Sequence, residues 1–194
     1  FFPFAAGLLL LATKGEQTKN IALGAALVEL VISIFAITQF KHDASTQFEF
    51  NHSWINLLGI NFHVGMDGIS LLLVLLTTFL VPIIILSHNP KSEIRNPNVF
   101  YSLILFMQMA LVGVFVSLDG FLFYIFWELA LIPIYFICLL WGGENRARIT
   151  FKFFIYTLTG SLLMLGGLIY LYLHTEGAHT FDINALYKSG QAMD

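Results

Sequence analysis

The chain of 194 residues has 9 basic and 12 acidic side chains, a formal net charge of −3, and a hydrophobic share of 58% against a charged share of 11%. Soluble domains have about 25% charged residues, so a water-soluble globule is excluded, and the mean hydropathy of +0.81 predicts an integral membrane protein. The acidic balance excludes nucleic acid as a partner, because nucleic-acid binding needs a basic patch. The single cysteine, Cys138, excludes disulfides and Cys-ligated zinc.

The apolar runs predict about six transmembrane helices. Crossing about 30 Å of hydrocarbon takes about 20 apolar residues. Only Asp119 and Gly120 separate the fourth run from the fifth, so these two helices are expected to be antiparallel neighbours. The chain opens at Phe1 rather than Met, and we expect it to be part of a longer protein. The predicted helices cover residues 1–12 (a short run), 21–40, 66–86, 100–118, 121–141 and 149–173.

The basic residues of the loops predict the orientation, because cytoplasmic loops of membrane proteins carry an excess of Lys and Arg. Seven of the nine fall on one side of the predicted helices, and this side is expected to face the cytoplasm or matrix, with Phe1 outside. The seven are Lys14, Lys19, Lys91, Arg95, Arg146, Arg148 and Lys152, and the other two are Lys41 and Lys188.

A short extramembrane β-hairpin is predicted between the second and third helices, at about residues 44–65. Apolar and polar residues alternate in 47–50 and in 59–64, and a period of two is typical of a strand. Residues 51–58 are expected to connect the two strands.

Glu128 is the strongest candidate for a functional residue. It lies seven residues after Phe121, so about 10 Å into the bilayer, where a charged side chain costs on the order of 2.5–3.5 kcal/mol on insertion scales. It should face the bundle interior, and there it either pairs with a cation or stays protonated. Both states suit a proton carrier, although a structural carboxylate bonded to a neighbouring helix is the alternative. Pro133 removes a helix hydrogen bond from the carbonyl of Leu129, and a kink there would give Glu128 polar neighbours.

Glu29 is the other acidic residue inside a predicted helix. Its one polar neighbour a turn further along is Ser33. The sequence leaves two interpretations open: a contact that packs two helices together, or a second proton site.

Lys152 begins a polar stripe on the sixth helix, with Tyr156 and Thr159 at helical spacing and Thr157 and Ser161 beside them. The stripe predicts an inward face in contact with water or polar partners. The alternative for Lys152 is that its ammonium group extends to the nearby membrane surface. Along the membrane normal it is expected to lie too far from Glu128 for a direct ion pair.

The remaining candidates have structural interpretations. Asp67 and Asp119 precede helices and are expected to cap them. Gly160, Gly166 and Gly167 are predicted to be positions of close helix packing. The six histidines all fall outside the predicted helices, so neither a metal site nor a haem site is expected.

Several segments resemble a known family, the antiporter-like subunits of respiratory complex I, the proton-translocating NADH–quinone oxidoreductase. The resemblance covers nearly the whole chain and is greatest to chain M, called chain 4 in mitochondria. The segments that carry it are Trp54-Ile55 with Gly59-Ile60-Asn61-Phe62-His63, the run from Met66-Asp67-Gly68 to Leu72, the run from Phe121 through Trp127-Glu128-Leu129 and Pro133 to Tyr135, and Arg148-Ile149-Thr150 with the run from Lys152 to Thr157.

The resemblance implies a larger bundle of about fourteen helices with two inverted five-helix repeats. Residues 1–98 would then hold the first three helices and the hairpin, and residues 99–194 the start of the first repeat. It also implies that Glu128 is essential and pairs with a lysine on a later, broken helix, and that Lys152 has a supporting role. Glu29 matches no family position.

The function implied is proton translocation coupled to electron transfer from NADH to quinone, in a bacterial or mitochondrial inner membrane. No cofactor is expected in this chain, since NADH, FMN, Fe–S clusters and quinone would bind to other subunits. Its partners would be the lipid bilayer and neighbouring membrane-arm subunits. The alternatives are a subunit of an Mrp-type cation/proton antiporter or of a membrane-bound hydrogenase, and a structural membrane-arm component without a proton path.

Overall fold

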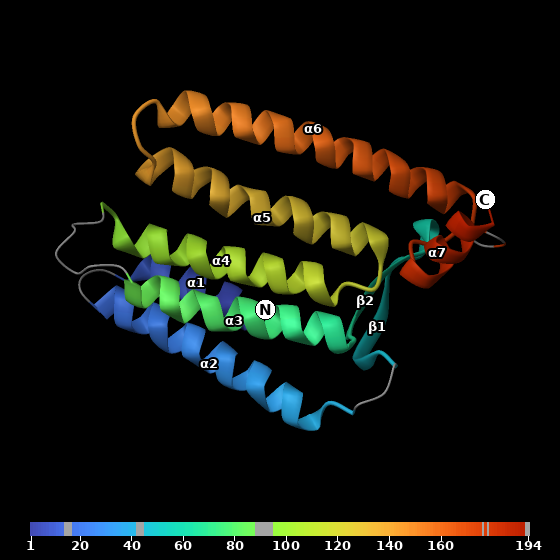
Figure 1. The fold of residues 1–194 in the computed structure, drawn as a ribbon, viewed down its shortest axis with the longest axis horizontal. Helices are drawn as coiled ribbons and strands as arrows, with labels where there is room; N and C mark the ends of the chain where they lie inside the picture. Colours follow the sequence, from blue (N-terminus) through green and yellow to red (C-terminus); the bar gives the residue numbers. More distant parts are fainter. Residues whose placement is uncertain (14–16, 42–44, 88–94, 176, 178, 193–194) are drawn as a thin grey trace.

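The computed structural model describes residues 1–13, 17–41, 45–87, 95–175, 177 and 179–192 (Figure 1). Helices run nearly the full length of the chain, and one two-stranded sheet lies between the second and third. In chain order the elements are α1 (Phe2–Ala12), α2 (Gln17–Gln39), β1 (Gln47–Ile55), the 3-10 turn η1 (Asn56–Leu58), β2 (Ile60–Met66), α3 (Gly68–Ser87), α4 (Pro97–Val116), α5 (Gly120–Trp141), α6 (Arg146–Leu173) and α7 (Ile183–Gln191).

The six predicted helices are confirmed, with ends within a few residues of those expected. Among the described residues, α2 to α6 are each long and apolar enough to cross a membrane, whereas α1 has 11 residues. The short helix α7 was not predicted. It has nine residues and begins where the Asp182 carboxylate accepts hydrogen bonds from the N–H groups of Asn184 and Ala185.

The hairpin is confirmed, but its first strand is longer than predicted. Residues 51–55, expected in the connection, continue β1, and Asn51, His52 and Ser53 pair with residues of β2. Their side chains are exposed whichever way they point, so no alternation of apolar and polar residues marks them as a strand. The connection is the single turn η1, which ends at Gly59 with a left-handed φ of 60°.

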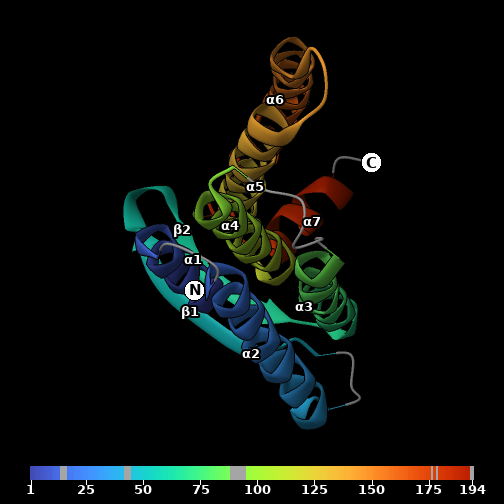
Figure 2. The same ribbon diagram turned by 90° about the vertical axis from the view of Figure 1, so that its left-hand side faces the viewer.

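Helices α1 to α4 pack together, α5 packs against α4, and α6 packs against α5. Figure 1 shows α2 to α6 side by side, and in the end view of Figure 2 α6 projects from the rest. A cluster of buried side chains joins α1 to α4, and small residues of α2 let that helix approach α4. The cluster consists of Leu10, Ala22, Ala26, Val81, Ile85, Tyr101, Ile104 and Leu105.

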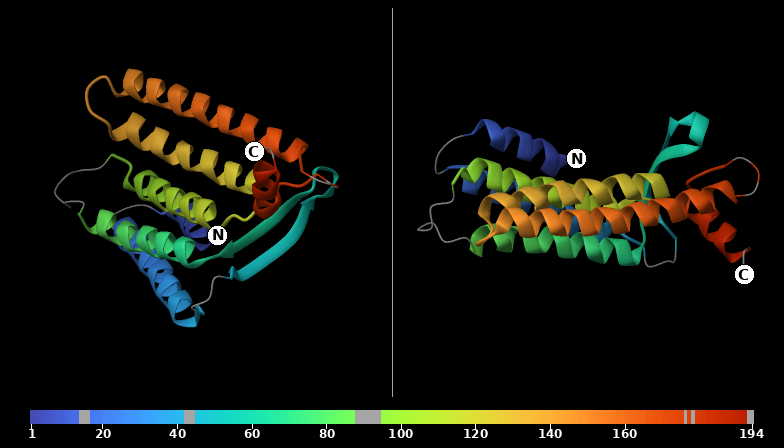
Figure 3. Two further views of the ribbon diagram at one scale, coloured as in Figure 1. Left: turned by 45° about the vertical axis from the view of Figure 1, so that its right-hand side comes forward. Right: turned by 90° about the horizontal axis from the view of Figure 1, so that it is seen from above.

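The α4–α5 turn is the meeting point of three segments that are far apart in sequence. The N–H of Leu118 donates to the carbonyl of His63 in β2 at 2.9 Å, and the N–H of Gly120 donates to the carbonyl of Phe181 at 2.7 Å. The His63 ring lies 3.3 Å from the carboxylate of Asp182. The hairpin and α7 therefore lie at the same end of the helices, as Figure 3 shows.

Candidate functional site: two buried carboxylates

Glu128 lies in the middle of α5 and is partly buried. Its Oε1 atom is buried and has no hydrogen-bond partner among the described residues. Tyr124, one turn earlier on α5, interacts through its hydroxyl with both the Glu128 carboxylate and the Ser161 hydroxyl of α6. The site is therefore a carboxylate with one oxygen free to take a proton, next to a hydroxyl group that can donate to it or accept from it.

Pro133 is buried inside α5, five residues after Glu128. Because proline has no N–H, the carbonyl of Leu129, directly after Glu128, has no partner at the usual helical position. A hydrogen-bond acceptor is therefore available in the backbone beside the carboxylate.

Lys152 lies on α6, away from Glu128. Tyr135 of α5 stacks edge-on against Phe154, and Tyr124 meets Ser161, so the position opposite Glu128 on α6 is near residue 158. Lys152 is therefore about 9 Å further along the helix axis. Within the described ranges the structure contains no ion pair between Lys152 and Glu128, as the sequence analysis expected.

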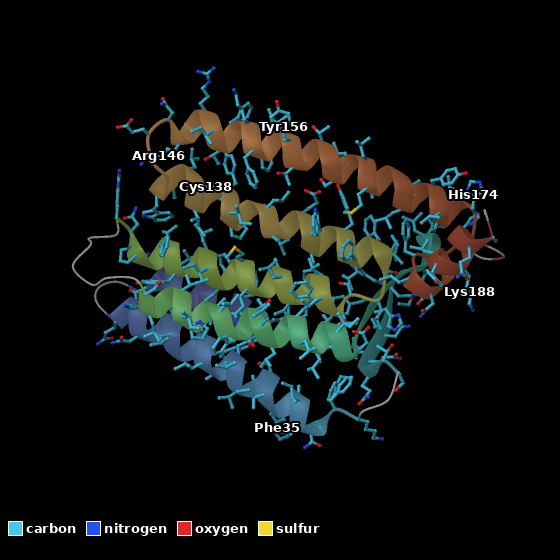
Figure 4. The ribbon with its side chains drawn as sticks, in the orientation of Figure 1. Phe35, Cys138, Arg146, Tyr156, His174 and Lys188 are labelled. Carbon is cyan, nitrogen blue, oxygen red and sulfur yellow. The ribbon has the colours of Figure 1, made fainter. Side chains whose placement is uncertain are left out.

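Only part of the predicted polar face of α6 contacts α5. Thr157 is half-buried and Ser161 is buried, but Lys152, Tyr156 and Thr159 are exposed, and Figure 4 shows Tyr156 on the side of α6 away from α5. Helical spacing identifies a polar face but not the neighbour that it meets, and in this chain α6 packs against α5 through the adjacent face.

Within the described residues, no neighbour packs closely at Gly160, Gly166 or Gly167, because a Cβ atom at any of them would have no atom within 4 Å, so the predicted close packing there stays a prediction. The close approach lies instead between α4 and α5. A Cβ atom at Gly113 would lie 2.3 Å from the Phe126 ring.

Glu29 lies in the middle of α2, and its Oε2 atom is buried with no hydrogen-bond partner in the described part of the chain. One turn further along, Ser33 forms a hydrogen bond of 2.7 Å with Thr78 of α3. Ser33 therefore links α2 to α3, while Glu29 faces a pocket of about 130 Å³ whose other walls come from α1, β2, α4 and α5.

Gln108 of α4 is a buried polar residue that the sequence analysis did not single out. It is 0% exposed, and neither atom of its amide has a hydrogen-bond partner within the ranges that the structure describes. A lone glutamine within the apolar run of residues 100–118 was the signal that could have found it, because a polar residue at membrane depth is costly.

The expected capping roles are confirmed. Asp67 Oδ1 accepts from the N–H of Ser70 at 2.7 Å, and this bond is the main reason that the pKa of Asp67 is lowered. Asp119 Oδ1 accepts from the N–H groups of Phe121 and Leu122, and its Oδ2 accepts from that of Asn61 in β2. Asp119 is 0% exposed, and burial raises its pKa above the ordinary value despite these bonds, with a further contribution from the charge of Asp182.

Among the described residues, no group of three or more His, Cys, Asp or Glu side chains is arranged to hold a metal ion. Inside the helices, Glu29 and Glu128 each have one buried carboxylate oxygen without a hydrogen-bond partner among the described residues. Both are suited to binding protons.

Two family models together match almost the whole chain. Residues 4–114 match the model described as NADH-ubiquinone oxidoreductase chain 4, amino terminus. The chain belongs to this family. Residues 117–193 match the model described as NADH:quinone oxidoreductase/Mrp antiporter, TM.

Relatives of chain 4 occur in several kinds of complex. The chain is 47% identical over 183 residues to F(420)H(2) dehydrogenase subunit M of Methanosarcina mazei, covering 90% of this chain and 37% of the relative. It is 40% identical over 191 residues to NAD(P)H-quinone oxidoreductase chain 4 of the chloroplast of Chlorokybus atmophyticus, covering 95% of this chain and 36% of the relative. The chain thus spans little more than a third of the length of these relatives.

The fold of this chain-4 member is also found in a solved complex. A chain of respiratory complex I from Thermus thermophilus with bound NADH matches with a TM-score of 0.84 at 28% identity, covering 97% of this chain and 38% of that chain. The match supports the arrangement of helices and hairpin described above, in a multi-pass membrane protein.

Proposed function

We propose that this chain is the amino-terminal part of a membrane-arm subunit of a proton-translocating NADH–quinone oxidoreductase, in which Glu128 takes up and releases a proton. The family model over residues 4–114 supports this assignment over an Mrp antiporter, because its description names chain 4 of the oxidoreductase alone. The model over residues 117–193 names both classes and does not separate them.

The observation that carries the proton-site proposal is the buried, unpartnered Oε1 atom of Glu128. A carboxylate at this depth is stable when protonated or when a cation lies close to it. A cation that approaches Glu128 favours the charged form and releases the proton, and its withdrawal favours uptake.

Lys152 and Tyr156 are proposed to support this pathway from α6. Both are exposed in this chain, so any proton path that includes them involves a partner beyond the 194 residues. The lysine that pairs with Glu128 is proposed to lie on a later helix of the same subunit.

The proposed orientation has the hairpin and Phe1 outside. At the end of the helices away from the hairpin lie Lys19, Arg95, Arg146 and Arg148, and this supports a cytoplasmic or matrix location for that end. Lys14 and Lys91 lie outside the described residues. The proposed partners are the other membrane-arm subunits, and NADH, FMN, Fe–S clusters and quinone are proposed to bind elsewhere in the complex.

The test is proton translocation per NADH oxidised in membranes that carry Glu128→Gln in the full-length subunit. We expect assembly at the wild-type level with a loss of at least about tenfold in coupled pumping, since the amide cannot bind a proton. Glu144→Gln, at an exposed carboxylate in the α5–α6 loop, is the matched control and should pump normally. Normal pumping by an assembled Glu128→Gln complex would show that this carboxylate is structural.

A second candidate is a subunit of an F(420)H(2) dehydrogenase, and it is favoured by the 47% identity to the Methanosarcina mazei protein. The two candidates differ in the electron donor, which is not bound by this chain in either proposal. Proton uptake by membrane vesicles supplied in turn with NADH and with reduced F420 distinguishes them. The proposed role of Glu128 is the same in both.

A further inference from the structure

Glu29 and Glu128 face different surroundings, although α2 and α5 both contribute to the same bundle. Phe126 of α5 lines the pocket next to Glu29. Glu128 follows two residues later, about 200° further around the helix, and its neighbours Tyr124 and Ser161 lie toward α6. The body of α5 therefore separates the two carboxylates, and Glu29 needs an explanation of its own.

The pocket beside Glu29 reaches from mid-membrane to the hairpin end of the molecule. Glu29 and Val112 contribute from helices, whereas Phe62 and Val64 belong to the extramembrane strand β2. Its volume of about 130 Å³ is enough for about four water molecules at about 30 Å³ each. Water entering from the hairpin side could thus reach the unpartnered oxygen of Glu29.

A second polar group lies at the same level. Ala26 of α2 packs in one cluster with Leu105 of α4, and one turn further along both helices come Glu29 and Gln108. Met109, next to Gln108, lines the pocket together with Glu29. Two buried polar groups without partners in the described structure at one level are unusual, and of the two it is Glu29 that lines the pocket.

We propose that Glu29 is a second proton-binding site, separate from Glu128, which exchanges its proton with the hairpin side of the membrane through this water-sized pocket. A proton from water forms a bond to the carboxylate oxygen on uptake and returns to water on release, so no other reactant is needed. The proposal requires a membrane-embedded chain but not the proposed role of Glu128.

The charged groups around Glu29 are few. Apart from Glu29, the residues that line the pocket have no titratable side chain. The amino group of Phe1 acts electrostatically on Glu29, but in a longer chain this amino group would be an uncharged peptide nitrogen. The proposal therefore makes no use of it.

The experiment labels the full-length protein, in the assembled complex, with dicyclohexylcarbodiimide, an apolar reagent that adds to protonated carboxyl groups in membranes. Sealed vesicles are prepared with the pH varied on one side at a time, and the adduct at Glu29 is followed by mass spectrometry. Sidedness is determined from the accessibility of a cysteine introduced as Lys188→Cys at the hairpin end.

We expect labelling of Glu29 to slow by up to about tenfold per unit of rising pH on the hairpin side, and to be insensitive to pH on the other side. Val112→Phe, which fills the pocket, should slow labelling several-fold, whereas Leu163→Phe on the exposed face of α6 should not. Absence of the adduct at every pH, or labelling that follows the pH of the opposite side, would overturn the proposal. Glu128→Gln should leave labelling of Glu29 unchanged, so a failure of the proposed function can be told apart from a failure of this inference.

Discussion

Helices α4 and α6 look alike in the sequence and differ in what surrounds them. Both are long and apolar enough to cross a membrane. Half of the residues in the apolar stretch of α4 are buried inside the chain, whereas in α6 the share is 6%. Helix α4 packs against α1, α2, α3 and α5, whereas α6 packs against α5 and α7.

This difference shows that the hydropathy of a helix indicates that it lies in a membrane but does not reveal how many other helices pack against it. Lipid tails are as apolar as leucine side chains, so a helix surrounded by protein and one facing lipid can have the same composition. In α4, the absence of a side chain at Gly113 lets the Phe126 ring of α5 approach closely. The glycines of α6 do not have this role within the 194 residues.

The largest expected effect is the loss of a packed side chain from α4. Leu105 is 0% exposed, and Leu105→Ala should lower the stability of the full-length subunit by about 2 kcal/mol. This is the low end of the range for cores, because in a membrane the cavity cost remains while the transfer from water does not apply. Leu163→Ala, at a side chain that is 76% exposed, is the control. Thermal denaturation of the purified complex measures the stability of both variants. An equal loss of stability in the two would show that the difference in burial between α4 and α6 does not hold in the complex.

An effect of similar size is expected from a methyl group added between α4 and α5. In Gly113→Ala the new Cβ atom would meet the Phe126 ring at 2.3 Å, and such overpacking costs about 1–3 kcal/mol. Gly160→Ala on α6 meets no atom within 4 Å and should be neutral or stabilising by up to about 1 kcal/mol, since alanine favours helix. The yield of assembled complex and its midpoint of thermal denaturation are the measurements. A Gly160→Ala variant as unstable as Gly113→Ala would show that α6 is covered by protein beyond this chain.

The smallest expected effect concerns Asp119, the carboxylate that caps the start of α5. Because burial raises the pKa of Asp119, the folded state favours its protonated form. The stability that this residue contributes is full below the ordinary aspartate pKa of about 3.9 and falls as the pH rises through the raised value. Asp119→Asn keeps the cap on α5 but loses the bond from the Asn61 N–H, which costs about 1 kcal/mol.

The loss of stability in Asp119→Asn relative to the wild type should therefore be greatest near pH 4 and become smaller toward neutral pH. Denaturation curves measured across this range test it. Asp67→Asn should show the opposite pH dependence, with the greater loss of stability at the higher pH. The pKa of Asp67 is lowered, chiefly by the N–H of Ser70, so its contribution is present above the ordinary aspartate pKa and is lost as the pH falls through the lowered value. Parallel pH profiles for the two variants would contradict the assignment of burial as the cause at Asp119.

Much of the fold could be predicted from the sequence because membrane insertion depends on composition alone. The six apolar runs give the helices, and the two residues between the fourth and fifth runs require a tight turn. The period of two in residues 47–50 indicated the start of β1, but it does not continue through the polar residues 51–53, whose side chains are all exposed. Helix α7 was missed because its apolar side chains, such as Ile183, Leu186 and Tyr187, follow helical spacing over only nine residues, which is too short a run to suggest a membrane-spanning helix.

The candidate site was predictable in its residues but not in its neighbours. A charge at membrane depth is costly wherever it lies, so Glu29 and Glu128 stand out in the sequence. Their surroundings depend on helix rotation and register, which a single sequence does not determine. The exposure of Lys152 and Tyr156, the contact between Tyr124 and Ser161, and the level shared by Glu29 and Gln108 therefore all required the structure.

The junction at the α4–α5 turn has a consequence for the order of events during synthesis. Its bonds to Phe181 and Ile183 cannot form until about 60 further residues have left the ribosome, which takes on the order of 3–12 s at about 5–20 residues per second. The cap of Asp119 on α5 and its bond to the hairpin can form earlier, because Asn61, Phe121 and Leu122 are already synthesised. Until α7 arrives, the N–H of Gly120 and the carbonyl of Leu118 lack the partners that they have in the finished fold.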